Sequence, residues 1–161
     1  MVEFALVAPL FFMVVFGGIE IGLMFRSYLA VENISRSGAR IASIQRDSPD
    51  ADDAILDRIE NQVAPLQGDV TQIVIFKADA LDDDVPTNCL TSSQSGSCNS
   101  YAVPDGDVAL ANPGTLGWDP TTRRAGDNIG IHIVFEYRYA TGFFNTLTLS
   151  TTTVEVIESD F

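Results

Sequence analysis

Positive charge is scarce in this chain. Nine lysine and arginine residues stand against 22 aspartate and glutamate residues, the formal net charge is −13, and Lys77 is the sole lysine. Because phosphate backbones repel such a chain, we do not expect nucleic acid as a partner. The acidity favours a surface exposed to salty or extracellular water, although a charge that only keeps a sticky protein dispersed fits the same numbers.

The residue patterns of common catalytic sites are also missing. His132 is the lone histidine, and it alternates with apolar residues in a predicted strand, where a structural or surface role is expected. No G-x-S-x-G, H-E-x-x-H or glycine-rich phosphate loop is present. We therefore expect no enzymatic activity and no cofactor.

Cysteine is equally rare. Cys89 and Cys98 are the 2 cysteines, in a segment rich in Ser, Asn and Gly with no histidine nearby, so a metal site is not expected. The spacing favours a disulfide that closes a surface loop and implies an oxidising location, with two free thiols as the alternative. In the chain-entropy account, closing so short a loop adds about 2–3 kcal/mol to stability.

The first 25 residues are unusually apolar. Residues 4–19 hold no charged side chain, and after Glu20 the next charge is Arg26. As a helix, residues 4–25 would measure about 33 Å, enough to cross the hydrocarbon core of a membrane. A removable signal peptide would begin with basic residues, whereas this segment begins with Glu3 and continues into further helical sequence. We expect the segment to be retained in the working protein.

Three features distinguish this segment from a plain membrane anchor, which is the alternative interpretation. Glu3 stands where a carboxylate favours a helix N-terminus and can neutralise a terminal amine such as that of Met1. Pro9 removes a backbone donor, and Glu20 lies in apolar sequence, where it is costly in lipid unless protonated or paired. Three glycines weaken the helix further: Gly17, Gly18 and Gly22.

The helical pattern continues to about residue 46. Apolar or small residues recur there at steps of three or four: Met24, Tyr28, Val31, Ile34, Gly38, Ile41 and Ile44. Such a stripe predicts that the outer half of the helix packs on a head, whereas the inner half, residues 4–25, needs lipid or protein neighbours. We therefore divide the chain into a membrane or filament-core helix, 1–46, and a globular head, 47–161.

Two stretches of this helix, VEFALVAPLFFMVVFGGIEIG at 2–22 and ENISRSGARIAS at 32–43, resemble the TadE-like pilins of tight-adherence (Tad) secretion systems. The C-terminal strand region is also similar to that family, whereas residues 80–127 are not covered. The resemblance implies a pilin-like subunit that enters the inner membrane, is cleaved by a prepilin peptidase and assembles with a secretion ATPase into a cell-surface adherence pilus. Pilins usually carry their glutamate as the fifth mature residue, whereas Glu3 is the third, which favours a trimmed mature form or a different processing site.

Under this hypothesis copies of the helix bundle into a filament. Glu3 would pair with a neighbour's N-terminal amine and fix axial register, while Glu20 would meet a neighbouring Arg26. Pro9 and the glycines would let the helix bend during transfer from lipid to filament. Two alternatives remain open: a minor pseudopilin that initiates or caps a filament of another subunit, and a single-pass membrane protein whose head binds a ligand.

The remaining sequence predicts a small head of the α+β class. Ser48-Pro49-Asp50 is typical of a helix start with Ser48 as N-cap, and we expect a helix over 49–64. Antiparallel strands are expected at 70–78, 129–139 and 146–158, with a turn through Thr141-Gly142. Because the apolar phase of the last strand changes, we also expect a bulge or bend near Thr151–Thr153.

Residues 80–127 form a long predicted surface excursion tied by Cys89 and Cys98, with a short strand near Tyr101–Val103. Its acids are weak candidates for calcium ligands, with solvated loop acids as the main expectation: Asp82, Asp83, Asp84, Asp105 and Asp107. The cluster Asp50, Asp52 and Asp53 is interpreted in the same way. Possible glycosylation positions are Asn33, which lies in a sequon on the long helix, and the hydroxyls of Thr91, Ser92, Ser93, Ser95 and Ser97.

Overall fold

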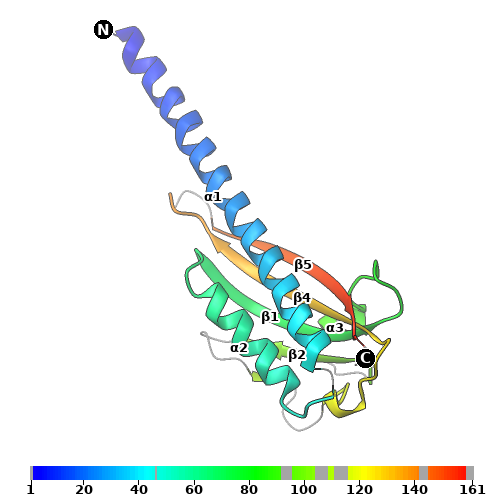
Figure 1. The fold of residues 1–161 in the computed structure, drawn as a ribbon. Helices are drawn as coiled ribbons and strands as arrows, with labels where there is room; N and C mark the ends of the chain where they lie inside the picture. The colour runs from blue at the N-terminus through cyan, green and yellow to red at the C-terminus, as the bar shows by residue number, and fades with distance from the viewer. Residues whose placement is uncertain are drawn as a thin grey trace.

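In a computed structural model of the protein, one long helix projects far beyond a small head (Figure 1). The structure describes residues 2–45, 47–91, 96–103, 109–110, 116–141 and 145–158. The long helix α1 (Val2–Gln45) and a second helix α2 (Ala51–Val63) lie beside each other on one face of an antiparallel sheet. This arrangement confirms the α+β class.

The sheet contains five strands in the order β3-β2-β1-β4-β5, and each strand is antiparallel to its neighbours. Three strands are long: β1 (Gly68–Ala78), β4 (Asn128–Arg138) and β5 (Thr146–Val156). The other two are short: β2 (Cys98–Ala102) and β3 (Ala109–Leu110). A short helix α3 (Thr87–Leu90) precedes β2, and a 3-10 turn η2 (Pro120–Thr122) precedes β4.

Of the bulge or bend predicted in the last strand, the bulge is wrong, and the bend stays a prediction. β5 pairs with β4 in an unbroken register, and the shift in the β1–β4 ladder lies between Val70 and Gln72 instead. The apolar phase of β5 changes because both faces of the sheet are covered. Leu149 packs against the core on the helical face, whereas Val154 packs against a smaller core on the opposite face.

The main core lies between the two helices and the sheet. It is built from aliphatic side chains of α1, α2, β1 and β4, and its fully buried members include Ile55, Ile59, Ile73, Ile75, Ile129, Ile131 and Ile133. The alternation predicted for 129–139 therefore identifies the strand correctly. On the opposite face, Gly130 leaves room for the Phe76 ring, since a Cβ at Gly130 would lie 2.2 Å from Cζ of that ring.

Helix α2 begins two residues later than the sequence pattern predicts. Its N-cap is Asp50, whose side chain makes no capping hydrogen bond, and Pro49 precedes the helix. Ser48 contributes to the turn before α2 instead: its Oγ accepts the Asp50 N–H at 3.4 Å, and its carbonyl accepts the Ala51 N–H at 3.1 Å. The expectation of Ser48 as N-cap is therefore wrong.

Candidate functional site

Part of α1 projects from the head, as Figure 1 shows. It exposes apolar side chains all around the helix. Its most apolar 18-residue stretch has a mean hydropathy of 2.2 and is only 6% buried, and the helix is long enough to cross a membrane. The side chains that are more than half exposed include Phe4, Leu6, Leu10, Phe11, Phe12, Met13 and Val14. Because so large an apolar surface is unfavourable in water, it must be covered by lipid or by protein.

The predicted assembly residues of this segment lie on one uninterrupted helix. Glu3 is exposed near its free end, and α1 continues through Pro9. A Cβ placed at Gly17, Gly18 or Gly22 would meet nothing within 4 Å, so packing inside the chain does not require these glycines. Met1 lies outside the described residues, and the pairing of Glu3 with a terminal amine stays a prediction.

Glu20 lies where α1 enters the head, and it is buried with only 4% of its surface exposed. The Tyr137 hydroxyl donates to its Oε1 at 3.2 Å. The backbone N–H of Ala140 donates to Oε1 at 2.8 Å, and that of Thr141 donates to Oε2 at 3.1 Å. The head thus supplies three donors to this carboxylate, and a contact with Arg26 of a neighbouring copy stays a prediction.

We call the group formed by Glu20, Tyr137, Ala140 and Thr141 the junction latch. Burial, and then the hydrogen bond to Glu20, raises the pKa of Tyr137, so its hydroxyl stays a proton donor. The two backbone donors lie just after β4 ends, where the strand ladder no longer provides acceptors. The latch therefore ties the base of the projecting segment to the end of β4.

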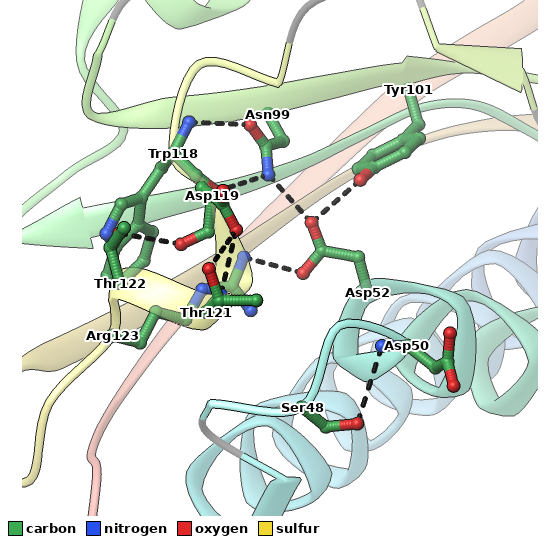
Figure 2. Close-up of polar contacts among 10 residues, drawn as sticks. All are labelled: Ser48, Asp50, Asp52, Asn99, Tyr101, Trp118, Asp119, Thr121, Thr122 and Arg123. Atoms are coloured by element: carbon green, nitrogen blue, oxygen red, sulfur yellow. Dashed lines mark hydrogen bonds and ion pairs between the residues drawn. The ribbon is translucent and has the colours of Figure 1, made fainter.

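A second buried polar cluster connects α2 to the long excursion, as Figure 2 shows. Asp52 Oδ1 lies 2.6 Å from Nη2 of Arg123, and Oδ2 accepts hydrogen bonds from Asn99 Nδ2 at 2.7 Å and from the Tyr101 hydroxyl at 2.8 Å. The Arg123 guanidinium lies over the Trp118 ring, with Cζ 4.6 Å from its centroid. The cluster, whose five members are these residues, holds the excursion against the head.

The positive charge of Arg123 is balanced by the carboxylate of Asp52. Arg123 is 1% exposed and Asp52 is 4% exposed, so water does not screen the pair. Among the described residues, no acceptor hydrogen bonds to Nε or Nη1 of Arg123. Burial, and then the nearby Asp52 carboxylate, raises the pKa of Tyr101 and keeps its hydroxyl protonated as a donor.

The sequence interpretation of Asp52 as a solvated acid is wrong. The helical period of α2 already indicated that Asp52 is buried. Asp52 precedes Ile55, Leu56 and Ile59 by three, four and seven positions, so it lies on the same buried face of the helix. Asp50 and Asp53 on the same segment are exposed, as expected.

The side chains of the other described candidate calcium ligands do not converge on one site. Asp83 Oδ2 accepts the backbone N–H of Asp79 at 2.7 Å and of Ala80 at 2.8 Å, so it closes a turn. Asp84 Oδ1 lies 3.5 Å from the Thr152 hydroxyl, and Asp82 is exposed. Within the described ranges, no group of three His, Cys, Asp or Glu side chains is placed to hold a metal ion. Asp105 and Asp107 lie outside those ranges.

His132 is 7% exposed on the face of the sheet opposite α1, and its Nδ1 lies 2.8 Å from the Thr152 hydroxyl. Burial lowers the pKa of His132, although the Asp84 carboxylate acts in the opposite direction. The histidine is therefore neutral near pH 7 and belongs to the packing of this face.

The predicted disulfide is present between Cys89 and Cys98. Both cysteines are fully buried and form a small second core with Val74, Phe76 and Val85 on the face of the sheet opposite the helices. Of the glycosylation candidates, Asn33 and Thr91 are exposed and Ser97 is partly exposed. Ser92, Ser93 and Ser95 lie outside the described residues, and glycosylation stays a prediction.

A match to a protein-family model supports the resemblance for the part of the chain that includes the projecting segment and Glu20. Residues 1–40 match the family model of TadE-like proteins. This segment is similar to TadE-like proteins. The match ends before α2, so the rest of the head lies outside it. No curated protein and no solved structure matches the chain.

Proposed function

We propose that this chain is a structural pilin-like subunit that assembles through its TadE-like helix into a Tad-like pilus filament on the cell surface. The observation that carries the proposal is the apolar segment of α1, which stands clear of the head and is only 6% buried. The inner membrane would cover this segment before assembly, and helices of other copies would cover it in the filament.

Energetics support assembly through the helix rather than through the heads. Burying apolar surface contributes roughly 25 cal/mol per Å², and the projecting segment exposes such surface on all sides. Residues 47–161 carry 19 acidic and 5 basic side chains, a net charge of −14, so without specific contacts the heads repel one another. The driving force for assembly therefore comes from the N-terminal segment.

Continuity of α1 supports retention of this segment in the assembled protein. The helix runs from Val2 to Gln45 without interruption, and its outer half supplies Val31, Ile34 and Ala42 to the head core. The latch at Glu20 also belongs to both parts. Processing by a prepilin peptidase, assembly with a secretion ATPase and a role in adherence follow from the family resemblance and belong to the proposal.

Shearing of producing cells, followed by electron microscopy and peptide identification, tests the proposal. We expect filaments in which this chain is the repeating subunit. Filaments with only traces of the chain would favour the minor pseudopilin, and detergent-soluble monomers without filaments would favour the anchored binding module. Either result would overturn the major-subunit proposal.

A charged residue on the projecting segment provides a sharper test. Phe12→Asp places a carboxylate on a side chain that is 52% exposed, and we expect it to abolish filaments because that surface must be buried. The matched control is Leu81→Asp, which alters a head side chain that is 59% exposed and should leave filament yield unchanged.

A further inference from the structure

We infer that neighbouring copies of this chain contact each other through two charged stripes on the helical layer of the head. The basic stripe consists of Arg26, Arg36 and Arg40 on α1, and the acidic stripe consists of Asp53, Asp57 and Glu60 on α2. This inference rests on the proposed function and deepens it, because it names the surface by which one subunit recognises the next.

Most cations in the described residues already have partners inside the chain. The ion pairs are Arg123 with Asp52, Lys77 with Asp127, Arg138 with Asp69, and Arg36 with Glu32. Arg58 donates to Ser37, and Arg124 donates to backbone carbonyls. Arg26 and Arg40 are exposed and form no ion pair with any described residue. Both of these free cations belong to the basic stripe.

The basic stripe occupies the side of α1 that faces away from the sheet. At 100° per residue, its three arginines lie within about 80° of one another around the helix axis. The buried positions Val31, Ile34 and Ala42 lie on the opposite side. Arg36 keeps a side chain that is 65% exposed despite its pair with Glu32, so it can also reach a second acid.

The acidic stripe is equally regular. Asp53, Asp57 and Glu60 follow at steps of four and three, which places them on one side of α2. All three are exposed, and no described cation pairs with them. The buried residues Ile55 and Ile59 lie on the other side of the helix. The stripe is thus held rigidly toward solvent by a well-packed helix.

An apolar groove of about 370 Å³ runs between the two helices beside the acidic stripe. Ile41 and Ile44 of α1 line one side, and Ile44 is 65% exposed. Asp57 lines the other side together with Ala54, Arg58 and Asn61, and Arg58 donates to Ser37 within the chain. The outward side of α1 carries an apolar residue among its arginines, Leu29, which is 41% exposed. In the inferred contact Leu29 of one copy occupies the groove of the next, with its flanking arginines beside the acidic stripe.

Charge complementarity identifies a second copy as the occupant. A chain with a net charge of −13 repels others like it, except where its few free cations meet its acids. Those cations lie on α1, the same helix that copies must bring together in order to bury its projecting segment. Exposed ion pairs contribute at most about 1 kcal/mol each. The stripes therefore select the neighbour and its register, while apolar burial supplies most of the affinity.

Charge reversal in the full-length chain tests this contact. We expect Arg40→Glu and Asp57→Arg each to lower filament yield severalfold, and the double variant to recover most of the wild-type yield. The matched control is Asp82→Arg, which reverses an exposed acid in the turn after β1, outside both stripe-bearing helices, and should leave the yield unchanged. Equal thermal unfolding of the variants in detergent would show that the heads remain folded.

The outcomes separate the contact from the proposed function. If the wild-type chain forms filaments and both single reversals assemble normally, or if the double variant is no better than the single ones, the contact is wrong while the filament proposal stands. If the wild-type chain yields only detergent-soluble monomers, the filament proposal and the contact both fail.

Discussion

Helix α1 is continuous, but its two halves owe their structure to different surroundings. If the inner half is counted only up to Ile19, just before the buried Glu20, it exposes large apolar side chains in every direction. The outer half begins with the buried Glu20 and packs one stripe, including Val31 and Ala39, against the head. The outer half is therefore stabilised by contacts with the rest of its own chain, whereas the inner half needs lipid or other copies to cover its apolar surface.

This contrast separates what stabilises the head from what drives assembly. A substitution in the head core should destabilise the head without altering the apolar surface of the inner half of α1. A change in the inner half should alter insertion or assembly and leave the unfolding of the head unchanged. The three predictions below test that separation, from the largest expected effect on head stability to the smallest.

Removal of the Asp52 carboxylate should have the largest effect on the head. Asp52→Ala leaves the buried Arg123 without a counter-charge, and we expect the free energy of unfolding to fall by about 3–5 kcal/mol. Urea unfolding of the purified chain in detergent, followed by tryptophan fluorescence, measures this loss. Asp53→Ala, at an exposed position on the same helix, is the control and should change stability by less than about 0.5 kcal/mol. Equal losses in the two variants would contradict the buried ion pair.

Disruption of the junction latch should have an intermediate effect. Glu20→Ala leaves the Tyr137 hydroxyl and the N–H groups of Ala140 and Thr141 without their acceptor, at a cost of about 1–3 kcal/mol. Glu20→Gln keeps one acceptor oxygen and should lose less. Hydrogen exchange of the Ala140 and Thr141 amides should accelerate in the alanine variant. Unchanged exchange at both amides would show that the latch does not hold the two parts together.

The pH dependence that His132 causes should be the smallest effect. Because burial lowers the pKa of His132 in the folded state, the unfolded state binds the proton first as the pH falls. Stability should therefore decrease as the pH falls below about 6.5, the ordinary pKa of histidine. Denaturant midpoints between about pH 7 and pH 5 measure this slope for the wild type and for His132→Gln. A slope that is the same in both proteins would assign the pH dependence to other groups.

The parts of the fold that repeat a local period could be predicted from the sequence. Alternation identified β4, and steps of three and four identified α1 and α2, because each pattern reports which side of an element is buried. The phase change in β5 was misinterpreted as a bulge because the sequence did not reveal a second core on the opposite face. The N-cap was misplaced because Ser48 and Asp50 have similar capping propensities.

Contacts between distant positions could not be predicted in this way. Tyr137 and Glu20 lie 117 positions apart, and Asn99 and Asp52 lie 47 positions apart, so no local pattern links them. Each buried acid was nevertheless visible as an anomaly, Glu20 in an apolar run and Asp52 on an apolar helix face. A charge at a buried position indicates that a partner exists, while only the fold shows which residue it is.

The Cys89–Cys98 disulfide links the second core of the head to the redox state of its surroundings. Both cysteines are fully buried beside Val74 and Phe76, so the disulfide forms part of the second core. Such cross-links persist where thiols are not continually reduced, which means outside the cytosol. Under the proposed function, a copy on the cytosolic side of the membrane would lack this cross-link, and export would be needed before the second core receives it.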